Sequence, residues 1–271
     1  IGKNLVNKLR EYKDLTIFEA NRQTFDLKES SKLIEYINLN KIDIIINTAV
    51  SLTDLSDNLS VLYTMIKASS AVSKIILLGS GIEYNPKRYK PLMDEEYFSL
   101  LDPPNDNNIY HNAKYITSAI LKTGQFKNIY NFRLFGVFGR FEDYTRRLIS
   151  NNIYTYLRDG KLKFNKDIAF DYLDVEDLAP AIYKFINNRN QPNHNEYNIC
   201  TGKPLKFSHI IETIRKYYGA DPSCVTIVDN SKSDYEYSGS PKRFEEEFNH
   251  QILQTSLISS IETLDIWLKQ E

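Results

Sequence analysis

The sequence has 271 residues, of which 42% are hydrophobic and 25% charged, and its formal net charge is −1 at pH 7. A chain of this length and composition can bury the core of one large domain or of two coupled ones. The balanced charge gives no electrostatic argument for nucleic acid or an anionic membrane as a partner, and no apolar run reaches the roughly 18 residues of a membrane span.

Strand-like and helix-like segments alternate through the first half of the chain. The spacing of apolar residues predicts helices over 2–12, 30–38, 58–73 and 110–123. A short apolar run covers 15–18, and strands are predicted over 42–46, 74–79 and 129–135. This alternation is typical of a parallel sheet with right-handed crossovers. We therefore predict an α/β fold with a Rossmann-type doubly wound parallel sheet.

The second half is less regular. We predict helices over 144–159, 176–187, 208–218 and 256–269, and strands over 170–175 and 196–200. A long polar loop, in which Pro91, Pro103 and Pro104 interrupt the chain, covers 84–109, and loops of that length usually have a function.

The cysteine and histidine content argues against a disulfide framework and against a metal centre. Cys200 and Cys224 are the two cysteines, and the four histidines are scattered. We therefore expect no metal and a reducing, cytoplasmic location. Because the first residue is Ile1 and no signal peptide is visible, we interpret the chain as beginning inside a longer gene product.

Tyr110 and Lys114 lie four residues apart in a predicted helix and therefore share one face. A tyrosine has a pKa near ~10. An ammonium group one turn away favours the phenolate, so we expect Lys114 to lower the pKa of Tyr110. The pair would then act as a general acid/base near neutral pH. The same spacing also arises as an exposed helix turn in a chain rich in tyrosine and lysine.

Ser80 follows a predicted buried strand in the segment Gly79-Ser80-Gly81-Ile82. The carboxyl ends of strands in open α/β sheets are where ligands bind. The Ser80 hydroxyl is therefore a candidate hydrogen-bond partner for a substrate oxygen beside Tyr110, and otherwise a turn serine.

Several segments, taken in order, resemble the extended short-chain dehydrogenase/reductase family, of the NAD-dependent epimerase/dehydratase type. They are IGKNLVNKL, DIIINTAVS, KIILLGSGIEY, YHNAK, NFRLFGVFG, FDYLDVEDLAPAI, YNICTGKPLKFSHI and TSLISSIETLDIWLKQ. The resemblance covers nearly the whole chain and implies an enzyme that acts on sugar nucleotides.

The resemblance also implies roles for individual residues. Ser80, Tyr110 and Lys114 would form the catalytic triad. The implied cofactor-binding residues are Gly2, Arg22, Asp26, Leu27, Thr48, Ala49, Val50 and Lys114. The implied substrate-binding residues are Ser80, Gly81, Ile82, Arg146 and Arg147.

The cofactor preference depends on the segment that follows the family's second strand. Arg22 lies where a 2′-phosphate contact falls, and guanidinium pairs well with phosphate. Glu19 is nearby and would instead hold a ribose hydroxyl. We favour NADP, with NAD as the alternative.

The chain departs from the family pattern at two places. Of the glycine-rich turn that cradles the cofactor's pyrophosphate, only Gly2 remains, so the turn is either trimmed or absent. Phe170 stands where many relatives have arginine, and the helical residues Arg146 and Arg147 either replace that diphosphate contact or form a solvated face.

The residues after Ser80 limit the reaction that the resemblance implies. Gly81 and Ile82 stand where 4,6-dehydratases have Asp and Glu, and Ile82 stands where fucose synthases have cysteine. The segment RLFGVFGRFEDYTRRLISNN resembles GDP-fucose-synthase-like and CDP-abequose-synthase-like reductases. We therefore favour NADP-dependent reduction of the C4 carbonyl of a nucleotide-linked 4-keto-6-deoxy sugar. The alternatives are a 4-epimerase with bound NAD and a catalytically silent nucleotide-binding module.

The resemblance implies two interleaved regions and a dimer. We predict a dinucleotide-binding domain from 1–137 and about 171–202, and a sugar-nucleotide-binding region from about 138–170 and 203–271. The helices predicted over 58–73 and 110–123 would pair across a two-fold axis to form a homodimer.

Overall fold

The computed structural model describes residues 1–271 except 101, 106 and 253. The helices are α1 (Gly2–Leu9), α2 (Ser30–Asn40), α3 (Leu55–Ala68), α4 (Ile109–Lys122), α5 (Leu148–Asp159), α6 (Val175–Ile186), α7 (Phe207–Tyr217), α8 (Lys242–Phe248) and α9 (Leu257–Leu268). The strands are β1 (Ile44–Asn47), β2 (Lys74–Ser80), β3 (Ile129–Leu134), β4 (Gly136–Phe138), β5 (Leu162–Lys166), β6 (Ala169–Phe170), β7 (Tyr172–Asp174), β8 (Glu196–Ile199), β9 (Leu205–Lys206), β10 (Val225–Asp229) and β11 (Glu236–Tyr237). Two positions of the loop predicted over 84–109 fall outside the described residues.

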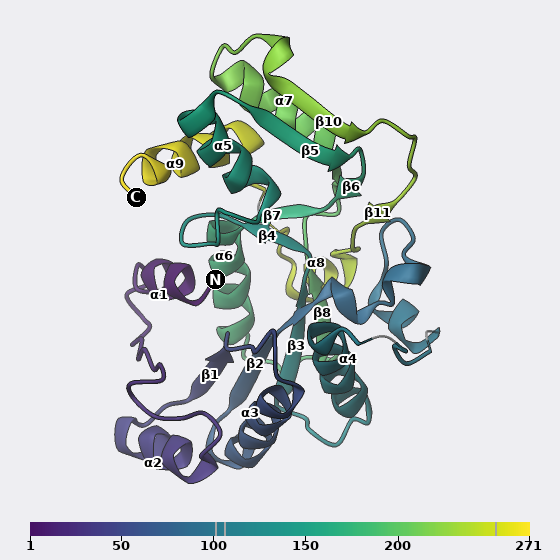
Figure 1. Ribbon diagram of the computed structural model, residues 1–271. Coiled ribbons are helices and arrows are strands. Elements are labelled where there is room, and N and C mark those ends of the chain that lie inside the picture. Colours follow the sequence, from purple (N-terminus) through teal and green to yellow (C-terminus); the bar gives the residue numbers. More distant parts are fainter. Residues whose placement is uncertain (101, 106, 253) are drawn as a thin grey trace.

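The central sheet has the strand order β1-β2-β3-β8, and its three pairings are parallel. Side chains alternate along β2, because successive residues of a strand point to opposite faces. Ile76 packs in the core shared with α1, α6 and α8, whereas Ile75 packs in the core shared with α2, α3 and α4. Helices therefore cover both faces of a parallel sheet (Figure 1), and the predicted doubly wound α/β fold is confirmed.

The apolar run over 15–18 does not form a strand in the structure. A strand needs a neighbour to satisfy its backbone hydrogen bonds, and β1 is the edge of the sheet as far as the structure describes it. Leu15 and Ile17 instead pack as partly buried side chains against the core that contains α1. The apolar run that precedes Arg22 therefore contributes to the core without being a strand.

A smaller unit packs beyond the carboxyl ends of the sheet (Figure 1). Its own core joins α5, α7 and α9 to the parallel pair β5–β10, with Ile149, Leu162 and Trp267 among its buried residues. Phe244 and Phe248 of α8 lie within 203–271, the range assigned from the sequence to the sugar-nucleotide-binding region. In the structure they pack instead in the core beside the central sheet.

Two observations concern membrane spans and metal ligands among the described residues. No helix of the described residues is long and apolar enough to cross a membrane. Within the same residues, no three His, Cys, Asp or Glu side chains gather closely enough to hold a metal ion. Cys200 is a buried free thiol and Cys224 a half-buried one.

Candidate active site

Ser80 is the last residue of β2, so its side chain stands at the carboxyl edge of the sheet. The backbone turns there into a short 3-10 helix, Gly81–Glu83, closed by a capping box. The Ser80 Oγ accepts from the Ile82 N–H at 3.3 Å, and the Glu83 Oε1 accepts from the Ser80 N–H at 2.9 Å. Both the side chain and the backbone N–H of Ser80 are therefore held by hydrogen bonds.

Tyr110 and Lys114 lie in the first two turns of α4, which runs alongside β2. Asn108 is the N-cap of this helix, and its Oδ1 accepts from the His111 N–H at 3.0 Å. The Lys114 Nζ lies 5.6 Å from the centroid of the Tyr110 ring and donates to the Leu78 carbonyl at 2.5 Å. The predicted one-face arrangement therefore places both groups beside the end of β2.

The electrostatics of the pair differ from the prediction. Burial raises the pKa of Tyr110, the Ser80 hydroxyl opposes the rise, and the Glu83 carboxylate adds to it. Burial also lowers the pKa of Lys114, against the effect of Glu83. The expectation that Lys114 lowers the pKa of Tyr110 is therefore wrong here, because burial dominates and the ammonium is directed to the Leu78 carbonyl.

A cavity of about 1090 Å³ lies at this end of the sheet and brings most of the predicted site together. Its walls include Ser80, Ile82, Tyr110, Lys114, Arg146 and Arg147. Gly81 does not line the cavity but supports its wall, because a Cβ there would lie 2.7 Å from the Tyr237 phenol oxygen. Phe170, the position at which the resemblance implied arginine, lines the cavity, and Lys163 is a lining cation that the sequence pattern did not indicate.

A second cavity, of about 520 Å³, gathers the other predicted cofactor residues. Its walls include Arg22, Asp26, Leu27, Thr48, Ala49 and Val50. Thr48 and Val50 line both cavities, so the two are neighbours along the edge of the sheet. Glu19 is directed elsewhere and forms an ion pair with Arg10 at 3.7 Å.

Gly2 lies beside the turn that borders both cavities. Gly2, the first residue of α1, approaches the turn after β1 so closely that a Cβ would lie 2.7 Å from the Thr48 Oγ1. That approach brings the amino end of a helix to the junction of the two cavities, where a pyrophosphate would be favoured.

Arg146 and Arg147 are not part of a helix, contrary to the prediction of a helix over 144–159. The Asp143 side chain accepts from the Thr145 N–H at 3.1 Å and makes a turn, so α5 begins only at Leu148, with Arg147 as its N-cap. Arg146 is largely exposed and lies 3.7 Å from Asp143. Arg147 lies near enough to Tyr110 and Tyr172 to lower the pKa of each against the effect of burial.

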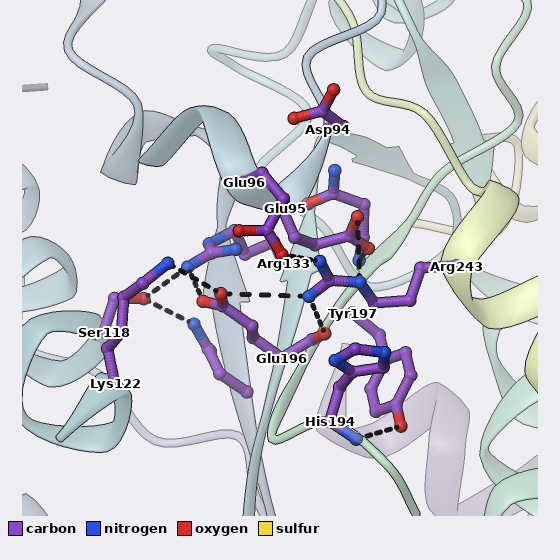
Figure 2. A network of polar contacts seen from close by, with 12 residues as sticks. Asp94, Glu95, Glu96, Ser118, Lys122, Arg133, His194, Glu196, Tyr197 and Arg243 are labelled. Carbon is purple, nitrogen blue, oxygen red and sulfur yellow. Dashed lines mark hydrogen bonds and ion pairs between the residues drawn. The ribbon is translucent and has the colours of Figure 1, made fainter. Parts of the chain in front are cut away.

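A buried polar network behind Ser80 was not predicted from the sequence. The Glu83 Oε2 accepts from the Asn131 Nδ2 at 2.9 Å, from the Arg133 Nε at 2.5 Å and from Ser118. Figure 2 shows the Arg133 guanidinium between Ser118 of α4 and Glu196 of β8, and Glu196 in turn beside Arg243. The signal was present as Asn131 and Arg133, two polar residues at alternate positions of a buried strand.

Comparison with known proteins identifies the family to which the chain belongs. The model of the NAD dependent epimerase/dehydratase family matches residues 1–200. The chain belongs to this family. The predicted resemblance to extended short-chain dehydrogenases/reductases and the prediction of an enzyme are thereby confirmed.

Individual relatives of the NAD dependent epimerase/dehydratase family are distant. A "Probable UDP-arabinose 4-epimerase 1" from Oryza sativa subsp. japonica is 30% identical over 101 residues, which are 37% of this chain and 24% of that protein. The chain therefore matches about a quarter of that relative's length.

Two solved structures share the fold at low identity. The GDP-L-fucose synthetase of Naegleria fowleri, bound to NADP, has a TM-score of 0.79 at 14% identity, over 99% of this chain and 90% of its own. A GDP-D-glycero-L-gluco-heptose synthase of Campylobacter jejuni, determined in the presence of NADPH, also has a TM-score of 0.79. Its sequence is 16% identical, and the match covers 100% of this chain and 95% of that one.

Proposed function

We propose that the protein reduces the C4 carbonyl of a nucleotide-linked 4-keto-6-deoxy sugar with NADPH. The observation that carries the proposal is the convergence of Ser80, Tyr110 and Lys114 in one cavity, with Gly81 and Ile82 following the serine. These three side chains suffice for ketone reduction, whereas elimination of water would need a further acid and base at those two positions.

The roles of the side chains follow from their positions. Tyr110 would give its phenolic proton to the carbonyl oxygen, while Ser80 donates a hydrogen bond to the same oxygen. The nicotinamide, when bound, supplies the hydride that the carbonyl carbon receives. Lys114 would stabilise the phenolate left on Tyr110 and bind the ribose. The ketone thus gains one hydride and one proton and becomes an alcohol, with NADP⁺ as the second product.

Arg22 supports NADP as the cofactor, because it lines the cavity that holds Asp26 and Leu27. The cations Arg146, Arg147 and Lys163 would pair with the diphosphate of the substrate. We also propose a cytoplasmic homodimer, with α3 and α4 as the paired helices.

A nucleotide-sugar 4-epimerase is the second candidate, favoured by the similarity to the probable UDP-arabinose 4-epimerase of rice. An epimerase oxidises and then reduces one carbon, so the same three residues serve it with NAD in place of NADPH. The two proposals therefore differ in cofactor and net reaction rather than in the triad.

The test is to mix the whole protein with NADPH and GDP-, CDP- or dTDP-linked 4-keto-6-deoxy sugars and follow the absorbance of NADPH. We expect turnover with one of the three, its loss in Tyr110→Phe, and weaker NADPH but unchanged NADH binding in Arg22→Ala. No NADPH consumption with any of them would reject the reductase. Interconversion of a UDP-sugar and its 4-epimer without added cofactor would favour the epimerase.

A further inference from the structure

A second tyrosine stands beside Ser80, contributed by a strand more than a hundred residues away along the chain. Tyr237 ends β11, which pairs with β6 so that Tyr237 lies opposite Phe170. Its ring is 8% exposed and lines the same cavity as Ser80, Tyr110 and Lys114. The phenol oxygen is so close to the Ser80 turn that a Cβ on Gly81 would lie 2.7 Å from it.

The position of the Tyr237 ring is fixed on several sides. Its centroid lies 5.0 Å from those of Phe135 and Phe170 and 5.1 Å from that of Tyr89. The Tyr237 carbonyl accepts from the Asp171 N–H at 2.9 Å. A ring held in this way can turn only about its own axis, so its hydroxyl stays at the Ser80 turn.

Tyr237 is able to donate a hydrogen bond in this position, because its phenol is neutral. Burial raises the pKa of Tyr237, and the Ser80 hydroxyl opposes that rise. The phenol therefore keeps its proton across the range in which an enzyme of this class works. A protonated phenol beside a hydroxyl oxygen can donate to it.

A serine oxygen has two lone pairs and one hydrogen. The Ile82 N–H already occupies one lone pair of Ser80. If Tyr237 occupies the other, the hydrogen of Ser80 is directed into the cavity, toward Tyr110 or a substrate oxygen. Donation to Ser80 also polarises its O–H bond, because chains of hydrogen bonds strengthen one another.

We propose that Tyr237 is a positioning residue of the active site, whose phenol donates to the Ser80 Oγ and thereby commits the serine hydrogen to the reacting oxygen. The proposal deepens the proposed function and rests on it, since it concerns the same oxygen that Tyr110 protonates. The proposal applies equally to reduction and to epimerisation, because both reactions transfer a hydride to or from the carbon that bears this oxygen.

The first test compares Tyr237→Phe with Tyr130→Phe in the reaction that the wild-type protein catalyses. Tyr130 is a matched control, because it is also buried and its hydroxyl bonds to Gln191 at 2.9 Å at the far end of β3. We expect Tyr237→Phe to lower kcat about tenfold with KM changed less than about twofold, and Tyr130→Phe to change neither. Equal kcat values for Tyr237→Phe and wild type would overturn the proposal.

The second test asks whether Tyr237 acts through Ser80. In a Ser80→Ala background, Tyr237→Phe should cause no further loss of kcat, because the acceptor of its hydrogen bond is gone. If the fold-loss of kcat in the double variant equals the product of the two single fold-losses, Tyr237 acts independently of Ser80 and the positioning role is rejected.

A third measurement needs no turnover and separates this proposal from the proposed function. Ring-labelled ¹³C-tyrosine gives a Cζ resonance for Tyr237, assigned as the one missing in Tyr237→Phe. Removal of the Ser80 hydroxyl in Ser80→Ala should shift this resonance and leave that of Tyr130 in place. An unmoved Tyr237 resonance would overturn the proposal even if the protein reduces its substrate, and a shifted one would support it even if the reductase assay fails.

Discussion

Ser80 is flanked by Gly79 and Gly81 because side chains press on both sides of its backbone. A Cβ at Gly79 would lie 2.5 Å from the Glu83 Oε1, and one at Gly81 would lie 2.7 Å from the Tyr237 oxygen. The nearest atoms are the Asn131 Oδ1, at 2.1 Å from the Cβ at Gly79, and the Phe135 ring, at 2.6 Å from the Cβ at Gly81, so neither position has room for a side chain. The Gly-Ser-Gly pattern is visible in the sequence, but the partners that require it include a tyrosine from a distant segment.

The buried pair of Glu83 and Arg133 gives a prediction at this scale. Both side chains are fully buried, with the Arg133 Nε at 2.5 Å from the Glu83 Oε2. Glu83→Gln leaves the guanidinium short of one counter-charge and turns an acceptor into a donor facing other donors. We expect the free energy of unfolding to fall by about 3 kcal/mol, and kcat to fall as well.

Urea unfolding and steady-state assays measure the two effects. The control is Lys32→Gln, which breaks an exposed ion pair with Glu29 at 2.9 Å and should change the free energy of unfolding by less than about 1 kcal/mol. Equal stability of Glu83→Gln and the wild type would mean that the pair contributes nothing net.

At the scale of elements, the sequence predicted what depends on local pattern. The 3.6-residue period located α4, and the apolar runs located β2 and β3, so the sequence alone placed Ser80, Tyr110 and Lys114 at one edge of a sheet. The apolar run over 15–18 is not a strand, because a strand depends on its neighbours as well as on its own residues. Tyr237 could not be found, because β11 is two residues long and its pairing with β6 is set by tertiary contact.

The N-cap of α4 gives a prediction for an element. Asn108, two residues before Tyr110 in the sequence, accepts a hydrogen bond from the His111 N–H. Asn108→Ala should fray the first turn, lower the free energy of unfolding by about 1 kcal/mol and reduce kcat more than it changes KM. Asn108→Ser keeps a capping oxygen and should retain most of the free energy of unfolding and most of kcat. If the alanine and serine variants behave alike in thermal unfolding and in turnover, the cap does not position Tyr110.

For the whole molecule, the segment between β4 and α5 connects the sheet to the smaller unit and places Glu142 in the wall of the main cavity. Burial raises the pKa of Glu142 to about 7, although the Ser150 hydroxyl, the Arg147 guanidinium and the Gly139 N–H oppose the rise. The Glu142 carboxyl lies near enough to Tyr172 to raise the pKa of that phenol further. The Oε1 of Glu142 is buried and has no hydrogen-bond partner among the described residues, which suits a neutral acid.

This carboxyl makes the stability of the fold depend on pH with a definite sign. Between the usual glutamate pKa of about 4.3 and about 7, the folded protein keeps a proton that the unfolded chain has lost. The free energy of unfolding therefore falls as pH rises through that window, by at most about 4 kcal/mol, and then levels off. Glu142→Gln stays neutral and should lose less stability between about pH 5 and about pH 8, whereas Glu29→Gln, an exposed control, should follow the wild type. Parallel falls for Glu142→Gln and the wild type in urea unfolding would show that Glu142 ionises in the fold as it does in water.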